Sequence, residues 1–273
     1  MSMVPIGVFD SGYGGLTVLS KIAGLMPQYD YVYLGDNARA PYGTRSFDVV
    51  YEYTLQSVKK LFSMGAPLVI LACNTASAKA LRTIQQVDLP QINPANRVLG
   101  VIRPSVEAVG NFSKTRKVGV FGTTGTVQSQ SYPLELAKIS PDIEVFQQDC
   151  PMWVPLVEYG EYASDGADYF VEQSVRALMS KCADIDTIIL GCTHYPLLMP
   201  KIRRFLPQGV NLLAQGDIVA SSLRSYLSRH SDIESCLTKG GTVRFLTTES
   251  VDKFSGAARI FFDGDLAVEH VDL

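Results

Sequence analysis

Two cysteines of this chain, Cys73 and Cys192, each follow a short apolar run and precede polar residues. The first lies in the segment ILACNTAS and the second in ILGCTHYP. A free cysteine is most often a small buried apolar residue, but a neighbouring histidine or a helix N-terminus favours the thiolate. Because both cysteines have the same place in similar segments, we expect reactive thiols rather than packing residues.

One histidine stands near these thiols in the sequence. His194 comes two residues after Cys192, where it could tune or reprotonate that thiol. The other cysteines and histidines lack such surroundings and are assigned to no site: Cys150, Cys182, Cys236, His230 and His270.

The glycine-rich turn that follows Asp10, SGYGG, does not match the common phosphate-binding motifs. A dinucleotide fingerprint would need glycine at Thr17, and no Gly-Lys-Ser/Thr of a P-loop follows. An Asp-x-Gly-x-Gly turn also occurs in sugar kinases and actin-like ATPases, which is a weak indication by itself. A zinc site formed by the two cysteines and His194 is conceivable, but no metal-binding spacing supports it.

Short β-branched runs alternate with longer amphipathic stretches along the whole chain. Apolar residues at helical spacing predict helices over Phe47–Met64 and Asp168–Ala183. Continuous apolar runs such as Leu68–Ala72 are typical of parallel strands covered on both faces. The sequence therefore predicts an α/β fold with mainly parallel sheets. The predicted strands are Val4–Phe9, Tyr31–Leu34, Leu68–Ala72, Val98–Ile102, Lys117–Phe121, Ile143–Phe146, Thr187–Leu190, Val210–Leu213 and Val243–Leu246.

The chain also resembles itself. GVFDSGYGG at Gly7–Gly15 is similar to GVFGTTGTV at Gly119–Val127, and the two cysteine segments recur after them in the same order. With a length of 273 residues, this repeat predicts two similar α/β domains, pseudo-twofold related, with the active site in the cleft between them. We expect residues 1–102 and 210–273 to form the first domain and residues 103–209 the second. We expect the chain to cross from one domain to the other at Leu89–Arg97 and at Pro207–Gly209.

Composition excludes several classes of protein. With 24 Lys and Arg against 27 Asp and Glu, the net charge of −3 offers no basic field for nucleic acid. Five cysteines are too few for a disulfide scaffold, and no apolar stretch is long enough to span a membrane. The first residues lack the features of a signal peptide. We therefore expect a soluble, cytoplasmic protein.

Two thiols at the ends of equivalent strands indicate a particular chemistry. In parallel α/β sheets ligands bind beyond the carboxyl ends of the strands, so the two thiols would flank one ligand from opposite sides. A thiolate on one face can remove a proton while a thiol on the other supplies one, which inverts a stereocentre. A thiolate is too weak a base to do this alone, so fixed N–H and hydroxyl dipoles must stabilise the carbanionic transition state.

In these segments the sequence resembles a known family, the cofactor-independent glutamate racemases. The combination of FDSG-x-GG, ACNTAS and GCTHYPL is specific to that family, and the matches run through nearly the whole chain in order. The matching segments are Ile6–Val18, Gly35–Gly43, Ala72–Ala78, Val118–Thr126 and Gly191–Leu197, with shorter likenesses at Pro155–Gly160 and Leu246–Thr248. The resemblance implies interconversion of L- and D-glutamate, which supplies D-glutamate for bacterial peptidoglycan. It also implies a homodimer that uses neither a cofactor nor a metal.

The resemblance further implies roles for individual residues. Cys73 matches the thiol that abstracts the α-proton of D-glutamate, and Cys192 the thiol that acts on L-glutamate. Asp10 and His194 match residues that assist these thiols, and Glu158 matches an acidic residue near the site. The substrate-binding segments of the family match Asp10, Ser11, Tyr42, Gly43, Asn74, Thr75, Thr193 and His194.

This sequence departs from the family's pattern away from the thiols. Asn37 stands where threonine is more frequent, Arg103–Pro104–Ser105 replaces a Glu-Pro-Gly-like segment, and Gln85–Arg97 is longer than is typical. Two alternative functions remain. One is racemisation of aspartate or another acidic amino acid, and the other is a non-catalytic, two-lobed protein that binds an acidic ligand.

Overall fold

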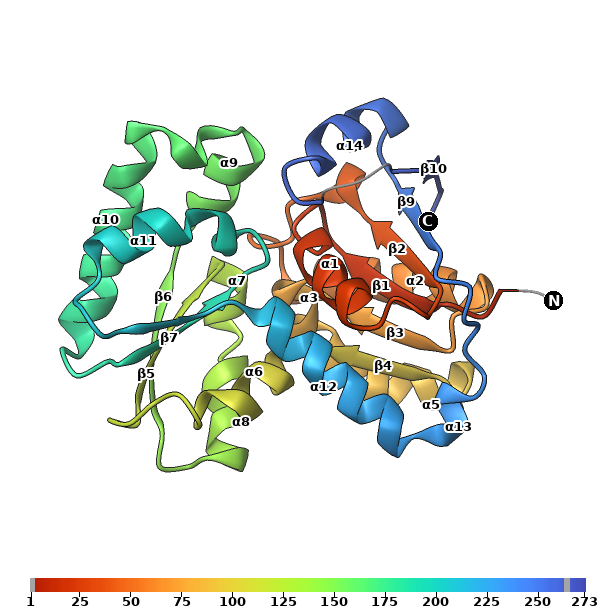
Figure 1. The fold of residues 1–273 in the computed structure, drawn as a ribbon, viewed down its shortest axis with the longest axis horizontal. Helices are drawn as coiled ribbons and strands as arrows, with labels where there is room; N and C mark the ends of the chain where they lie inside the picture. The colour runs from red at the N-terminus through yellow and green to blue at the C-terminus, as the bar shows by residue number, and fades with distance from the viewer. Residues whose placement is uncertain (1–2, 263–265) are drawn as a thin grey trace. The chain divides into compact units, whose positions relative to one another are not determined.

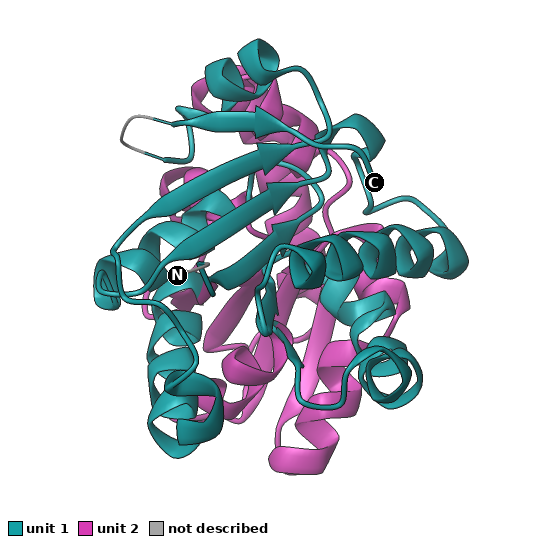
Figure 2. Cartoon of the chain, turned by 90° about the vertical axis from the view of Figure 1, so that its right-hand side faces the viewer, with its two compact units in different colours: residues 1–101, 216–273 teal, residues 102–215 magenta. Residues whose placement is uncertain are grey.

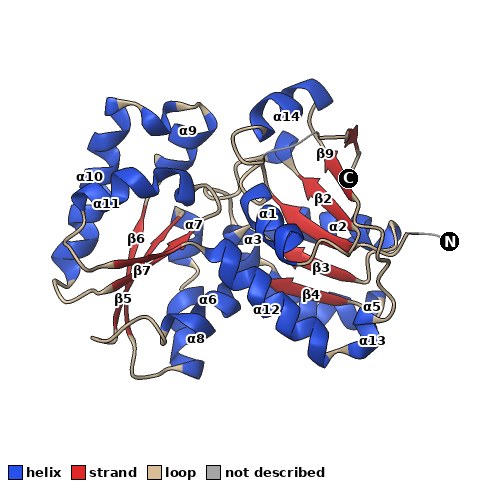
Figure 3. Cartoon of the chain, in the orientation of Figure 1, coloured by secondary structure: helices blue, strands red, loops and turns tan. Residues whose placement is uncertain are grey.

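A computed structural model of the chain describes residues 3–262 and 266–273 (Figure 1). The chain divides into two compact units, drawn in different colours in Figure 2. Unit 1 comprises Met1–Val101 and Gly216–Leu273, and unit 2 comprises Ile102–Gln215. Each unit contains one parallel sheet with helices around it, as Figure 3 shows. The α/β fold with parallel sheets that the sequence predicts is therefore confirmed.

The sheet of unit 1 has the strand order β10-β9-β2-β1-β3-β4, and all its neighbouring strands are parallel. The strands β1, β2 and β3 consist of fully buried residues, as expected for strands covered on both faces. The bounds are β1 Ile6–Asp10, β2 Tyr31–Gly35, β3 Leu68–Leu71, β4 Arg97–Gly100, β9 Val243–Thr247 and β10 Val268–His270.

The helices of unit 1 connect these strands and cover the sheet. Because β2 and β3 lie on opposite sides of β1, right-handed crossovers place α1 and α2 on opposite faces. The long α2 begins after Ser46, whose hydroxyl accepts a hydrogen bond from the Val49 N–H. The helical segments are α1 Leu16–Leu25, η1 Asn37–Arg39, α2 Phe47–Ser63, α3 Asn74–Lys79, α4 Leu81–Thr83, η2 Ile84–Asp88, α5 Leu89–Ile92, α12 Gln215–Arg229, α13 Ser231–Glu234 and α14 Val251–Ala258.

The sheet of unit 2 has four parallel strands in the order β6-β5-β7-β8. Its strands are β5 Lys117–Gly122, β6 Glu144–Asp149, β7 Thr187–Gly191 and β8 Asn211–Leu213. Its helical segments are α6 Ile102–Val109, α7 Thr124–Gln128, α8 Ser131–Ile139, α9 Trp153–Glu158, η3 Glu161–Ala163, α10 Asp165–Lys181, η4 Tyr195–Leu198 and α11 Met199–Phe205.

The two units repeat one topology. The order β2-β1-β3-β4 in unit 1 corresponds to β6-β5-β7-β8 in unit 2, so β1 matches β5 and β3 matches β7. The internal repeat read from the sequence is thus a repeat of strand order. Both copies of the first repeated segment begin with a glycine, Gly7 or Gly119, because a helix packs closely against the strand at this position. A Cβ at Gly7 would lie 3.3 Å from Leu61 of α2, and one at Gly119 would lie 2.8 Å from Leu178 of α10.

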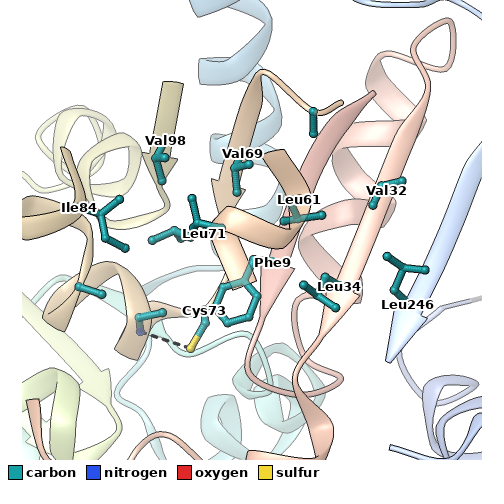
Figure 4. Close-up of a cluster of buried hydrophobic side chains, with 14 of the residues drawn as sticks. Phe9, Val32, Leu34, Leu61, Val69, Leu71, Cys73, Ile84, Val98 and Leu246 are labelled. Carbon is teal, nitrogen blue, oxygen red and sulfur yellow. Dashed lines mark hydrogen bonds between the residues drawn. The ribbon is translucent and has the colours of Figure 1, made fainter. Parts of the chain in front are cut away.

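The core of unit 1 surrounds the end of β3. Phe9, Leu34 and Leu71 from neighbouring strands pack with Leu61 of α2, and Cys73 lies at the margin of this buried cluster (Figure 4). The sheet therefore fixes the backbone on which the first thiol is placed. Among the described residues, no helix is long and apolar enough to cross a membrane.

The structure differs from the expected elements at several ends. The strand expected over Val98–Ile102 ends at Gly100, and Ile102 begins α6. Pro104 lies in the first turn of this helix, where a proline is tolerated. The strand β8 pairs with β7 and so belongs to the sheet of unit 2, whereas residues 210–273 are expected to lie in the first domain. The chain is expected to cross between the domains at two segments, but Leu89–Arg97 lies within unit 1 and Pro207–Gly209 lies within unit 2.

Candidate active site

The polar clusters of unit 1 meet at the carboxyl edge of its sheet. Asp10 ends β1 and pairs with Gly35, the last residue of β2. Phe9 pairs with Leu71 of β3, and its carbonyl accepts a hydrogen bond of 2.8 Å from the Ala72 N–H. This register places the turn after β1 beside Cys73, as the sequence predicts for strands that end together.

Cys73 is 6% exposed and is the N-cap residue of α3. Its Sγ accepts a hydrogen bond of 3.4 Å from the Ala76 N–H, the dashed line in Figure 4, and shares one of 3.3 Å with the Ser11 hydroxyl. Asn74 and Thr75 follow in the first turn of the helix and are each 3% exposed. The first turn of α3 thus directs a backbone N–H donor at this sulfur.

Asp10 lies almost completely buried at the base of the glycine-rich turn. Its carboxylate accepts a hydrogen bond of 3.0 Å from the Gly12 N–H, and the Tyr33 hydroxyl donates one of 2.9 Å to the Gly12 carbonyl. Burial, and then the nearby Asp10 carboxylate, raises the pKa of Tyr33 well above its ordinary value, so Tyr33 stays a neutral donor. Gly15 has no room for a side chain, since a Cβ there would lie 2.5 Å from that of Asp10.

Tyr42 is buried, and its hydroxyl is committed to a partner within unit 1. It donates a hydrogen bond to the Asp36 carboxylate, which also accepts one from the Arg39 guanidinium. Burial raises the pKa of Tyr42 far above its ordinary value, and the Asp36 charge raises it further. Tyr42 is therefore a neutral donor whose hydroxyl anchors the segment that carries Gly43.

In unit 2, Cys192 follows β7 as Cys73 follows β3, and it is 7% exposed. His194 approaches it through Nδ1, 3.8 Å from the sulfur, and its Nε2 lies 3.0 Å from a carboxylate oxygen of Glu158. The structure thus joins three of the predicted residues into one row, in which a carboxylate orients an imidazole toward a thiol. Thr193 lies between the thiol and the imidazole in sequence and is 5% exposed.

The charge state of His194 follows from these contacts. Burial alone would lower its pKa, but the hydrogen bonds to Cys192 and Glu158 and their negative charges outweigh burial and raise it to about 10. At neutral pH the ring is therefore an imidazolium, which donates to both partners.

Aromatic packing holds the helix that supplies Glu158. The Trp153 ring of α9 lies 4.8 Å from the Phe121 ring at the end of β5, and 4.8 Å from the Tyr195 ring, next to His194 in sequence. Trp153 and Tyr195 are fully buried, so the start of α9 is fixed against the carboxyl edge of the sheet. The end of this short helix then presents Glu158 to the imidazole.

A third buried cysteine lies at the same edge of unit 2. Cys150 follows β6, and its thiol donates to the Gln148 carbonyl at 3.7 Å. Burial raises the pKa of Cys150 well above its ordinary value, and the charge of Asp149 adds to this effect. Cys150 is thus held as a neutral thiol. Cys182 is half-buried and Cys236 is exposed, away from these clusters in the sequence.

One polar segment of unit 2 was missing from the expected site. Gly122 pairs with Gly191, so Thr123 after β5 lies beside Cys192 after β7. The Thr123 hydroxyl accepts a hydrogen bond of 3.2 Å from the Thr126 N–H and caps α7. The internal repeat contains the signal that could have found it, because Thr123 has the place in GVFGTTGTV that Ser11 has in GVFDSGYGG.

The remaining predicted residues can also be placed. Asn37, one of the departures from the family's pattern, accepts a hydrogen bond of 3.0 Å from the Thr247 hydroxyl through its side-chain oxygen. His230 stacks on Tyr226 and His270 is exposed. Within residues 3–262 and 266–273, no group of three or more His, Cys, Asp or Glu side chains is arranged to hold a metal ion.

Comparisons with known proteins point to one enzyme family. The family model described as Asp/Glu/Hydantoin racemase matches residues 16–223. The chain is 42% identical over 266 residues to the glutamate racemase of Paracoccus denitrificans, covering 94% of this chain and 96% of that protein. It superposes with a TM-score of 0.90 on a glutamate racemase structure from Bacillus anthracis, at 34% identity, covering 100% of this chain and 99% of that one.

A second similar structure holds a ligand. It is the glutamate racemase of Francisella tularensis in complex with D-glutamate, with a TM-score of 0.88 and 32% identity. The superposition covers 100% of this chain and 98% of that one. The similarity therefore extends over both units.

Proposed function

Because this chain belongs to the glutamate racemases of the Asp/Glu/hydantoin racemase family, we propose that it interconverts L- and D-glutamate with Cys73 and Cys192 as the two proton-transferring thiols. Membership of the family makes it an amino-acid racemase, an isomerase. The observation that carries the proposal is the equivalent placement of the two thiols, each within two residues of the carboxyl end of the matching strand of its unit. A protein that only binds an acidic ligand has no need of two such thiols.

The proposed reaction moves one proton off the α-carbon and another onto it. With D-glutamate, the Cys73 thiolate takes the α-proton and the Cys192 thiol delivers one to the opposite face. The C–H electron pair stays on carbon in between, and afterwards Cys73 is a thiol and Cys192 a thiolate. The reverse reaction begins on L-glutamate at Cys192. The two thiols therefore titrate as a coupled pair, one ionised and one protonated for each direction.

The surroundings of each thiol supply what a weak base lacks. A thiolate with an ordinary pKa near ~8.5 is far too weak to deprotonate an amino-acid α-carbon in water. Hydroxyl and N–H donors with fixed positions can stabilise the carbanionic transition state in a buried site. In unit 1 we assign this role to Ser11, Asn74 and Thr75, with the backbone of Gly43. In unit 2 we assign it to Thr193 and His194.

A direct test follows the optical activity of glutamate. Purified protein, dialysed free of pyridoxal phosphate, is mixed with D-glutamate or with L-glutamate, and circular dichroism is recorded until it stops changing. We expect both samples to converge on zero, and in D2O the α-proton to be replaced by deuterium. A substrate panel that contains aspartate tests the choice of amino acid. Equal rates on aspartate and glutamate would contradict the assignment, and tight glutamate binding without proton exchange would favour a binding protein.

We also propose that the D-glutamate formed supplies peptidoglycan synthesis in the cytoplasm and that the enzyme is a homodimer. The resemblance to bacterial glutamate racemases supports both statements. Growth of a bacterial D-glutamate auxotroph that expresses this chain, without added D-glutamate, tests the first. Sedimentation velocity with and without D-glutamate tests the second, and a monomer under both conditions would contradict it.

A further inference from the structure

A second carboxylate at the edge of unit 1, that of Asp36, takes no part in the proton transfers. Asp36 directly follows β2, as Asp10 ends the neighbouring β1, and its backbone N–H donates to the Asp10 carbonyl at 3.0 Å. Its side chain is fully buried. A buried carboxylate is costly unless it is paired and hydrogen-bonded, so its partners indicate what it holds in place.

The side-chain partners of Asp36 come from two separate segments. One carboxylate oxygen, Oδ2, accepts from the Arg39 Nε at 2.7 Å and from the Tyr42 hydroxyl. The other, Oδ1, accepts from the Thr248 hydroxyl at 2.9 Å, in the turn after β9. The Thr248 hydroxyl accepts in turn from the Ala38 N–H at 3.0 Å. One buried group thus connects β2, the segment from residue 37 to residue 43 and the turn after β9.

The same segment is fastened to α2 by Arg39. The guanidinium lies 4.1 Å from the centre of the Tyr53 ring, and its Nη1 donates to Gln56 at 2.5 Å. The Tyr42 ring lies 5.8 Å from that of Tyr53. The ring contacts hold the outer side of the segment, but the Tyr42 hydroxyl is fixed by Asp36.

We propose that Asp36 is a positioning residue that sets the place of the Tyr42–Gly43 segment for substrate binding. This inference rests on the proposed function, in which that segment binds glutamate. The Tyr42 hydroxyl already donates its proton to Asp36, so the segment would contact the substrate through backbone N–H groups. The positions of these groups depend on the hydrogen bond between Tyr42 and Asp36. Loss of the anchor should weaken binding of substrate and transition state alike, and such a change raises KM while kcat is kept.

Asp30 offers a matched control. It directly precedes β2 at the opposite end of the same strand, and it is also buried, at 5% exposure. Its carboxylate accepts from the Thr242 N–H at 3.0 Å, the Thr242 hydroxyl at 2.6 Å and the Gly240 N–H at 3.2 Å. Removing either carboxylate leaves buried donors unpaired, so both changes should lower stability. Only the change at Asp36 touches the substrate-binding edge.

The test measures kcat, KM and Tm for Asp36→Ala and Asp30→Ala. For Asp36→Ala we expect KM for both enantiomers to rise roughly tenfold or more, with kcat within about threefold of the parent. For Asp30→Ala we expect a comparable fall in Tm and a KM within about twofold of the parent. An unchanged KM in Asp36→Ala, or an equal rise in Asp30→Ala, would overturn the inference.

Two further variants keep the inference testable if Asp36→Ala does not fold. Asp36→Asn can place its oxygen toward Arg39 and Tyr42 and its amide toward Thr248, so KM should return to within about threefold of the parent. Tyr42→Phe removes the anchored hydroxyl and should raise KM roughly fivefold. Because both changes act through one anchor, KM of a double variant with Asp36→Ala should not exceed that of Asp36→Ala alone, and KM of a double variant with Asp36→Asn should not exceed that of Tyr42→Phe alone. An unchanged KM in Tyr42→Phe overturns the inference. Failure of the parent protein to racemise glutamate contradicts the proposed function instead.

Discussion

The two thiol sites occupy equivalent positions but are surrounded by different chemistry. In unit 1, Cys73 accepts a hydrogen bond from a backbone N–H of α3 and shares one with the Ser11 hydroxyl. In unit 2, Cys192 faces the imidazole of His194, which is itself paired with the Glu158 carboxylate. The repeat of strand order sets the position of each thiol. The residues around the end of the strand determine which groups form hydrogen bonds with its sulfur.

This difference has a limit set by thermodynamics. The equilibrium constant of a racemisation is one, because the two enantiomers have the same free energy in water. The ratio kcat/KM must therefore be equal in both directions for every variant, whichever thiol site is altered. Differences between the two sites can emerge only in kcat and KM taken separately, in their pH dependence, or in half-reactions at one thiol.

The largest expected effect is the loss of either thiol. Cys73→Ala and Cys192→Ala should each reduce racemisation in both directions by at least about 10³-fold, because each direction uses one thiol as base and the other as acid. Circular dichroism with D- and L-glutamate measures this. Cys236→Ala is the matched control, since Cys236 is exposed, and it should keep the parent rate. Racemisation at the parent rate by Cys73→Ala would refute the two-thiol mechanism.

Loss of the supporting group at each thiol should have smaller and unequal effects. We expect His194→Gln to reduce kcat/KM roughly 10²-fold, as is typical for loss of a charged group that assists proton transfer. Ser11→Ala should reduce it only about tenfold, since a neutral hydrogen bond is weaker than a charge-assisted one. Initial rates in both directions measure the two losses. A larger loss for Ser11→Ala would reverse the comparison between the units.

Removing the charge of Glu158 should alter the pH dependence more than the maximum rate. The Cys192 sulfur and the Glu158 carboxylate together raise the pKa of His194 to about 10, so Glu158→Gln lowers that pKa. The imidazolium is then lost at a lower pH, and the alkaline limb of the rate profile should move toward neutrality. Rates from pH 6 to pH 10.5 measure the shift. Ser11→Ala should leave that limb in place, and an identical shift in both variants would contradict the assignment.

The smallest effect concerns stability rather than activity. The pKa of His194 is raised from 6.5 to about 10 in the folded protein. Its contribution to stability is therefore fully present below about pH 6.5 and is lost as pH rises toward 10. Denaturant unfolding should show the parent on the order of 1–3 kcal/mol more stable than His194→Gln near neutral pH. This difference should shrink steadily at alkaline pH, and a difference that grows there would contradict the charged state.

Much of this architecture is visible in the sequence because the signals are local. Apolar runs such as Leu68–Ala72 end in polar residues, and that pattern alone places Cys73 and Cys192 at the carboxyl ends of strands. The strand β10 has no such run: its three residues, Val268–His270, pair with β9, and the Glu269 carboxylate accepts hydrogen bonds from the Arg244 guanidinium. No local pattern in the sequence therefore predicts this strand.

The polar network at the sheet edge could be predicted only in part. The family resemblance includes Asp36 and Tyr42 in one matching segment, Gly35–Gly43, but the anchor at Thr248 comes from more than two hundred residues away. Such a contact depends on β9 pairing with β2, which no local pattern reveals. The family resemblance placed Glu158 only near the site, and its contact with His194 is seen in the structure alone, because no spacing rule connects a helix end with the turn after β7.

The division of labour between the thiols is tested most directly by α-proton exchange in D2O, followed by proton NMR in Cys73→Ala and Cys192→Ala. A variant that keeps one thiol can still remove and return the proton on one face, although it cannot racemise. We expect Cys73→Ala to exchange the α-proton of L-glutamate faster than that of D-glutamate, and Cys192→Ala to show the opposite preference. The reverse pattern, or exchange of both enantiomers at equal rates in each variant, would contradict the assignment of one thiol to each enantiomer.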